Sequence, residues 1–101
     1  MQKFTFLFLW VLLFFSVSGF SQTLTISDSG EIGNSGSNWS TSGNNPVTIT
    51  ATGTADVNTS VIEGYLNAGT SVILEGLKIV IANTINKTAG GDATLTLRAG
   101  G

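Results

Sequence analysis

The side chains best placed to do chemistry are two carboxylates, Glu31 and Asp56, which stand 25 positions apart. If the chain coils with a period of about that length, the two acids lie on one face in successive coils. Such a pair could hold calcium or act as acid and base on a polysaccharide. The alternative is that both are isolated, solvated acids near turns, since neither has the clustered basic neighbours that would stabilise a carbanion.

Histidine and cysteine are both absent from the chain. Their absence removes Ser-His-Asp and Cys-His triads, thiolate or imidazole metal sites, and disulfide bonds. Asp92 follows two glycines and is expected in a turn. We therefore assign no catalytic, cofactor-binding or metal-binding residue, and we expect a protein that is not an enzyme and needs no cofactor.

Two other features could form a binding surface. Trp39 lies in a glycine-rich stretch, where it could stack on a sugar ring if exposed or fill the core at a corner. Two columns of polar residues could form a flat threonine face that binds ice or carbohydrate, although Pro46, Ser71 and Ile73 interrupt them. The columns are Thr23, Pro46, Ser71, Thr94 and Thr25, Thr48, Ile73, Thr96.

A repeat would position these residues. Four segments carry apolar residues at alternate positions, and their first residues are separated by 23, 25 and 23 positions. Alternation with period two is typical of a strand with one buried face, and a nearly constant spacing indicates a repeat. The four segments begin at Leu24, Val47, Val72 and Leu95.

Further apolar sites and glycines keep approximate step with these anchors. One set of sites is Ile32, Val57 and Ile79 to Ile81, and the next is Trp39, Val61 to Ile62, and Ile85. Three strands in each coil of 23–25 residues predict an all-β parallel β-helix. The alternative is a small antiparallel β-sandwich, which also has closely spaced short strands. Helix has little support, because β-branched residues concentrate in the candidate strands and Gly, Asn, Thr and Ser fill the connections.

The N-terminal segment is typical of a secretory signal peptide. One lysine precedes an apolar run from Phe4 to Phe15, which is too short to span a hydrocarbon core of about 20 apolar residues. Small residues at Gly19 and Ser21 favour cleavage after Ser21. We therefore expect a signal peptide at 1–21 and a protein that is secreted or exposed on the outer cell surface.

The part after the predicted cleavage site contains three cations and six anions, a net charge of −3. Such a surface releases few phosphate counterions, so nucleic-acid binding is not expected. We expect a Gly/Ser/Asn-rich N-terminal coil or cap at 22–45 and β-helix coils at 46–101. Because no capping segment follows the fourth anchor, we expect this region to be truncated.

Residues 85–99 (INKTAGGDATLTLRA) and 66–74 (LNAGTSVIL) resemble coils of filamentous haemagglutinin-type proteins, which are large exported bacterial adhesins. The resemblance covers about residues 45–101 and implies that the β-helix is right-handed. It also implies that alternate apolar residues of the strands point inward while Thr94 and Thr96 point outward.

The resemblance further implies an adhesin-like structural protein that forms a β-helix shaft. Its expected partners are surface glycans or proteins and an outer-membrane secretion machinery. The alternative function is the N-terminal part of a polysaccharide-active lyase or hydrolase.

Overall fold

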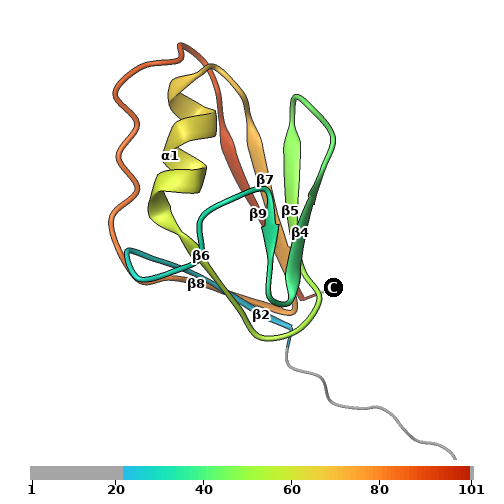
Figure 1. The fold of residues 1–101 in the computed structure, drawn as a ribbon. Coiled ribbons are helices and arrows are strands. Elements are labelled where there is room, and N and C mark those ends of the chain that lie inside the picture. Colours follow the sequence, from blue (N-terminus) through green and yellow to red (C-terminus); the bar gives the residue numbers. More distant parts are fainter. Residues whose placement is uncertain (1–21, 101) are drawn as a thin grey trace, which may run out of the picture.

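The computed structural model describes residues 22–100, and the predicted signal peptide at 1–21 lies outside them. Eight strands and one helix are present in these residues (Figure 1). In chain order they are β2 (Thr23–Ser27), β3 (Ser35–Gly36), β4 (Trp39–Ser42), β5 (Val47–Ala51), β6 (Ala55–Asn58), α1 (Thr59–Asn67), β7 (Val72–Gly76), β8 (Lys78–Ile81) and β9 (Leu95–Ala99).

The strands form two small sheets. Three parallel strands make one sheet in the order β6-β2-β8, and five strands make the other in the order β3-β4-β5-β7-β9. In the larger sheet β5, β7 and β9 are parallel, whereas β3, β4 and β5 pair antiparallel. Figure 1 shows α1 beside the larger sheet and the smaller sheet crossing below them.

The predicted β-helix is wrong, because the described residues form two small sheets and no closed solenoid. The first anchor, Leu24, does not pair with Val47. It lies in the smaller sheet, where it pairs with Ala55 on one side and Ile79 on the other. The expected third strand of each coil is also missing. Trp39 lies in a hairpin, the sites at 61–62 lie in a helix, and Ile85 lies in an irregular segment.

The alternative prediction, a small antiparallel β-sandwich, does not match the structure either. Four of the six strand pairs among residues 22–100 are parallel. The spacing of the last three anchors nevertheless matches the observed register. Val47 pairs with Val72, and Val72 pairs with Leu95. Stacked apolar side chains on one face fix this register, because a slip of one residue would turn them to the other face.

Helix α1 was not expected from the sequence. Asn58 caps it: the Asn58 side chain accepts a hydrogen bond from the Ser60 N–H at 2.9 Å, as N-cap residues do. The buried helix residues Ile62 and Leu66 are one turn apart and face the core. This i, i+4 pair was a sequence signal for the helix, but the prediction assigned Ile62 to a strand.

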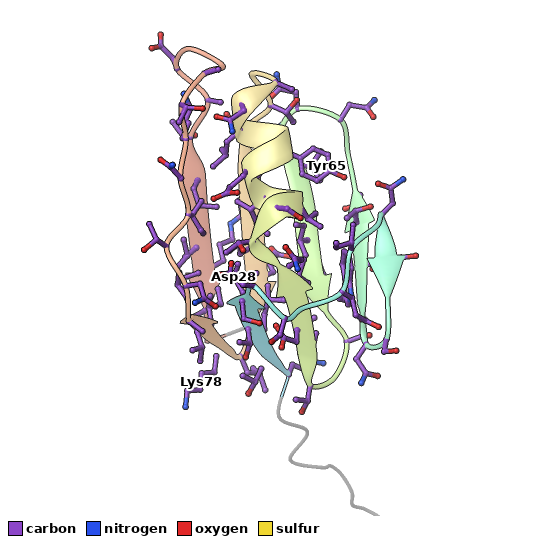
Figure 2. All side chains as sticks on the ribbon, turned by 60° about the vertical axis from the view of Figure 1, so that its left-hand side comes forward. Asp28, Tyr65 and Lys78 are labelled. Carbon is purple, nitrogen blue, oxygen red and sulfur yellow. The ribbon has the colours of Figure 1, made fainter. Side chains whose placement is uncertain are left out.

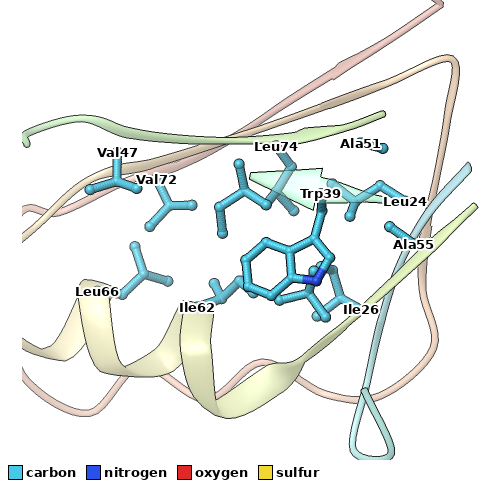
Figure 3. Close-up of a cluster of buried hydrophobic side chains, with 12 residues drawn as sticks. Leu24, Ile26, Trp39, Val47, Ala51, Ala55, Ile62, Leu66, Val72 and Leu74 are labelled. Atoms are coloured by element: carbon cyan, nitrogen blue, oxygen red, sulfur yellow. The ribbon is translucent and has the colours of Figure 1, made fainter. Parts of the chain in front are cut away.

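The core lies between the two sheets and α1 (Figure 3). Figure 3 shows the Trp39 ring at its centre, with side chains of both sheets and the helix around it. Leu24, Ile26, Ile49, Val57, Ile62, Val72 and Leu74 are fully buried.

An irregular segment, residues 82–94, connects the two sheets and is bound to α1 by hydrogen bonds. The Glu63 carboxylate accepts from the Asn86 N–H at 2.8 Å. The Asn67 side-chain oxygen accepts from the N–H groups of Thr88 and Ala89 at 2.7 and 3.0 Å. Side chains of the helix thus satisfy backbone donors of a segment that has no strand or helix of its own.

Candidate functional site

Glu31 and Asp56 are neighbours along the backbone but do not form a shared site. The Glu31 N–H donates to the Asp56 carbonyl at 2.8 Å, and Glu31 forms a parallel bridge with Val57. Their carboxylates have different partners. Glu31 accepts from the Trp39 indole N–H and the Ser37 N–H, both at 2.8 Å, whereas Asp56 accepts from the Ser27 hydroxyl at 2.7 Å.

These partners give both carboxylates a structural role. The hydrogen bond from Trp39 lowers the pKa of Glu31, and the N–H of Ser37 adds to the effect, because both donors favour the charged form. A general acid at neutral pH needs a raised pKa, so Glu31 is poorly suited to that task. The geometry therefore gives no support to an acid–base pair at these residues.

Sequence reasoning missed a polar cluster at the carboxyl ends of the three parallel strands. The Asp28 carboxylate accepts a hydrogen bond from the Thr59 hydroxyl, and the Asp28 N–H donates to the Asn83 side chain at 2.9 Å. The Asn58 amide donates to the Asp28 carbonyl at 3.0 Å. The signal was that β2 and β6 end in polar residues and that Asn83 follows the end of β8 by two positions. Within residues 22–100 no group of three or more acidic, His or Cys side chains could hold a metal ion.

The structure also places the other candidates. Trp39 is 2 % exposed, so it fills the core and does not present a stacking surface for a sugar. Asp92 lies in a turn, as predicted. Thr48, Ile73 and Thr96 do form one row of the larger sheet, but Thr25 belongs to the smaller sheet, so the predicted threonine column is divided.

A groove of about 410 Å³ lies beside the ends of β5, β7 and β9, lined mainly by Gln22, Thr50, Glu75, Gly76 and Arg98. Glu75 accepts from Arg98 at 3.0 Å and from the Thr50 hydroxyl at 3.2 Å. The three residues form one polar row across neighbouring strands. Their charges are largely satisfied within the row, so the groove has little unpaired polarity to offer a ligand.

The distinctive surface is the end of the molecule where β8 and β9 are the outermost strands of their sheets. The core side chains are uncovered there: Leu97 is 47 % exposed, although it is in register with fully buried Leu74. Ile81 is 40 % exposed, although it is in register with fully buried Ile26. Leu77, in the turn between β7 and β8, is 47 % exposed. We call these three residues, with β8 and β9, the open end.

The opposite edge of the larger sheet is protected. It ends in the two-residue strand β3, and very short edge strands offer little template for pairing. Glu31 and Trp39 cross-link this hairpin to the core. By contrast, β8 and β9 have four and five residues, and within residues 22–100 no further strand pairs with their outer sides. Exposed apolar strand edges of this kind mark interaction sites.

No helix among residues 22–100 has the length and apolar character needed to cross a membrane. No protein-family model matches the chain, and neither a curated protein nor a solved structure matches it.

Proposed function

We propose that the protein is a secreted or cell-surface structural protein of the adhesin type, which joins other polypeptides by accepting their strands at the open end. The observation that carries this proposal is the exposure of Leu97 and Ile81, two side chains that continue columns of fully buried core residues. A strand added beside β9 or β8 would cover them and use the free backbone groups of the edge. This is recognition by β-augmentation.

Three features of the sequence support the proposal. The leader at 1–21 is typical of export, and the acidic balance of the remaining chain argues against nucleic acid as a partner. The resemblance of residues 45–101 to filamentous haemagglutinin-type proteins points to a surface role, with an outer-membrane secretion machinery as a transient partner. Among surface partners, proteins with extended strands fit the open end better than glycans, because its exposed groups are aliphatic and not aromatic.

Strand addition can be tested with a labelled peptide that copies residues 93–99 (ATLTLRA). The full chain is expressed in a secreting bacterial host, and the exported protein is titrated against the peptide by fluorescence anisotropy. We expect binding of this peptide and at least tenfold weaker binding of a scrambled peptide in which the leucines are adjacent. Equal binding of both peptides, or binding of surface glycans alone, would overturn the proposal.

The intact mass of the exported protein tests the location in the same preparation. We expect a chain that begins at Gln22. A protein retained in the cytoplasm with residues 1–21 intact would contradict the secreted location.

A further inference from the structure

A second groove lies between α1 and the segment that precedes β3. Its volume is about 370 Å³, and it is lined on one side by residues 32–34 and on the other by Ser60, Val61, Gly64 and Tyr65 of α1. This volume falls within the range of about 300–1,000 Å³ that is typical of ligand pockets. The groove shares no residue with the open end. Figure 2 shows Tyr65 on the flank of α1, apart from Asp28 and Lys78.

The groove combines an aromatic ring and aliphatic groups with uncharged polar groups. Tyr65 is half-buried, and Ile32 is 73 % exposed. The Tyr65 hydroxyl donates to the Asn34 side-chain oxygen at 3.4 Å, which is long for such a bond. Within residues 22–100 the Ser60 hydroxyl and the side-chain nitrogen of Asn34 have no hydrogen-bond partner. These polar groups are therefore available to a ligand.

None of the residues that line this groove is charged. Two acids, Glu31 and Glu63, are sequence neighbours of lining residues, but their carboxylates have partners elsewhere. Glu31 accepts from Trp39, and Glu63 accepts from the Asn86 N–H. A charged ligand would lose hydration here without gaining a counter-charge, and the loss of hydration is costly. The groove therefore suits an uncharged ligand that has both apolar and polar faces.

Gly64 keeps the α1 side of the groove open. A Cβ at this position would meet nothing within 4 Å, so no contact with the rest of the fold requires glycine here. Glycine inside a helix costs about 0.5–1 kcal/mol relative to alanine, so it is unfavourable for α1 itself. What glycine provides is bare backbone that a flat ligand can approach closely beside the Tyr65 ring.

We propose that this groove binds a short stretch of an uncharged glycan chain. The apolar C–H face of a sugar ring packs on Tyr65 and Ile32, and the sugar hydroxyls form hydrogen bonds with Asn34 and Ser60. A lipid chain would need an enclosed pocket, whereas a sugar ring keeps its other face in water. The site goes beyond the proposed function, because it gives the protein a glycan contact that does not depend on strand addition at the open end.

Amide chemical shifts of the exported, isotope-labelled protein test the site. The probes are maltohexaose, cellohexaose and mannohexaose, with the anionic hexagalacturonate as the charged comparison. We expect at least one neutral sugar, at millimolar concentration, to shift the amides of residues 32–34 and 60–65, and hexagalacturonate to bind at least tenfold more weakly. Shifts with none of the three neutral sugars, shifts confined to other residues, or equal binding of hexagalacturonate would overturn the site.

Gly64→Leu separates sugar binding from folding. Leucine fills the groove from the α1 side and is a better helix former than glycine. We therefore expect the dissociation constant for the sugar to rise at least tenfold, while the melting temperature stays at or above that of the wild type. Thr52→Leu, in the exposed turn between β5 and β6, is the matched control and should bind as the wild type does. Unchanged sugar binding by Gly64→Leu would rule the groove out.

Two variants of Tyr65 test the packing of the sugar on the ring. Tyr65→Phe keeps the ring, whereas Tyr65→Leu keeps apolar bulk against the core but has no flat face. We expect Tyr65→Phe to bind within about threefold of the wild type and Tyr65→Leu to bind at least tenfold more weakly. Circular dichroism checks that both variants fold. Equal sugar binding by the wild type and Tyr65→Leu would contradict the proposal.

The outcomes separate this inference from the proposed function. A protein that binds the strand peptide but none of the neutral sugars keeps the proposed function and overturns the glycan groove. Binding of a neutral sugar without binding of the strand peptide supports the groove and overturns strand addition. Shifts of the groove amides by the strand peptide would make a peptide the occupant, and the glycan assignment would be wrong.

Discussion

The indole N–H of Trp39 donates to the Glu31 carboxylate at 2.8 Å, and this bond ties the segment before β3 to the centre of the core. Gly36 lies so close to both side chains that a Cβ at this position would collide with them. The buried indole satisfies its only donor on a carboxylate that also holds the Ser37 N–H. One acid therefore organises the whole hairpin.

Replacing Glu31 should lower the melting temperature. Glu31→Ala leaves the indole N–H without its acceptor, whereas Glu31→Gln keeps a neutral acceptor and should lose less. Thermal unfolding followed by circular dichroism measures both. Equal melting temperatures for wild type and Glu31→Ala would show that the bond contributes nothing.

The same residue predicts a pH dependence. The pKa of Glu31 in the folded protein lies below its ordinary value of 4.5, mainly because Trp39 donates to the charged form. Its stabilising contribution is complete above pH 4.5 and is lost as the pH falls through the folded pKa. The difference in melting temperature between wild type and Glu31→Gln should therefore shrink as the pH falls from neutral to well below 4.5. A constant difference would contradict this assignment.

Two glycines should respond in opposite directions to alanine. Gly64 lies on the exposed side of α1, where an added Cβ meets nothing, so Gly64→Ala should stabilise the protein by about 0.5–1 kcal/mol. At Gly30 an added Cβ would overlap the backbone of Val57 and Asn58, so Gly30→Ala should destabilise it. Urea unfolding gives both free energies, and a stable Gly30→Ala variant would show that the contact relaxes easily.

The cap of α1 should be measurable at Asn58. Asn58→Ala removes the acceptor for the Ser60 N–H and should cost about 1 kcal/mol, with a further loss from the two bonds that its amide donates. Asn58→Asp keeps the cap but not the donors, so its stability should lie between those of wild type and Asn58→Ala. The order of the three unfolding midpoints in urea tests this, and Asn58→Ala equal to wild type would exclude a capping role.

Leu74 and Leu97 are in register, but alanine should lower stability more at Leu74, because the core is covered there and is uncovered at Leu97. Leu74→Ala leaves a cavity at a fully buried site and should lower the free energy of unfolding by about 2–5 kcal/mol. Leu97→Ala at the open end should lower it by less than about 1.5 kcal/mol. Unfolding in urea at low nanomolar protein concentration, with intrinsic fluorescence as the signal, compares them. Similar losses of unfolding free energy at both positions would mean that Leu97 is as buried as Leu74.

The sequence predicted the parallel register of Val47, Val72 and Leu95, because the local alternation and the spacing both followed the buried column. It could not predict the place of Leu24, since the same alternation suits either sheet and only tertiary pairing decides. The helix was missed because Val61 and Ile62 were interpreted as a strand, although Asn58 and the pair of Ile62 and Leu66 were available as signals.

The candidate functional residues were also predicted only in part. The 25-residue interval between Glu31 and Asp56 did indicate a backbone neighbourhood, but spacing says nothing about where a side chain points. The carboxylates turn to Trp39 and Ser27 instead. The open end depends on the order of strands in two sheets, which no short stretch of the sequence encodes.

The position of β2 has a consequence for the order of folding. Among residues 22–100 it is the first strand, yet it lies in the middle of its sheet and pairs with both β6 and β8. Leu24 therefore cannot form both of its strand pairings until Ala55 and then Ile79 have been synthesised. A chain that leaves the ribosome from its N-terminus cannot complete this sheet until residue 81 has emerged. Contacts between such distant residues slow folding, because a long loop must close before they form. The smaller sheet therefore stays incomplete until β8 has been synthesised, and until then β2 lacks the strand that pairs with its second edge.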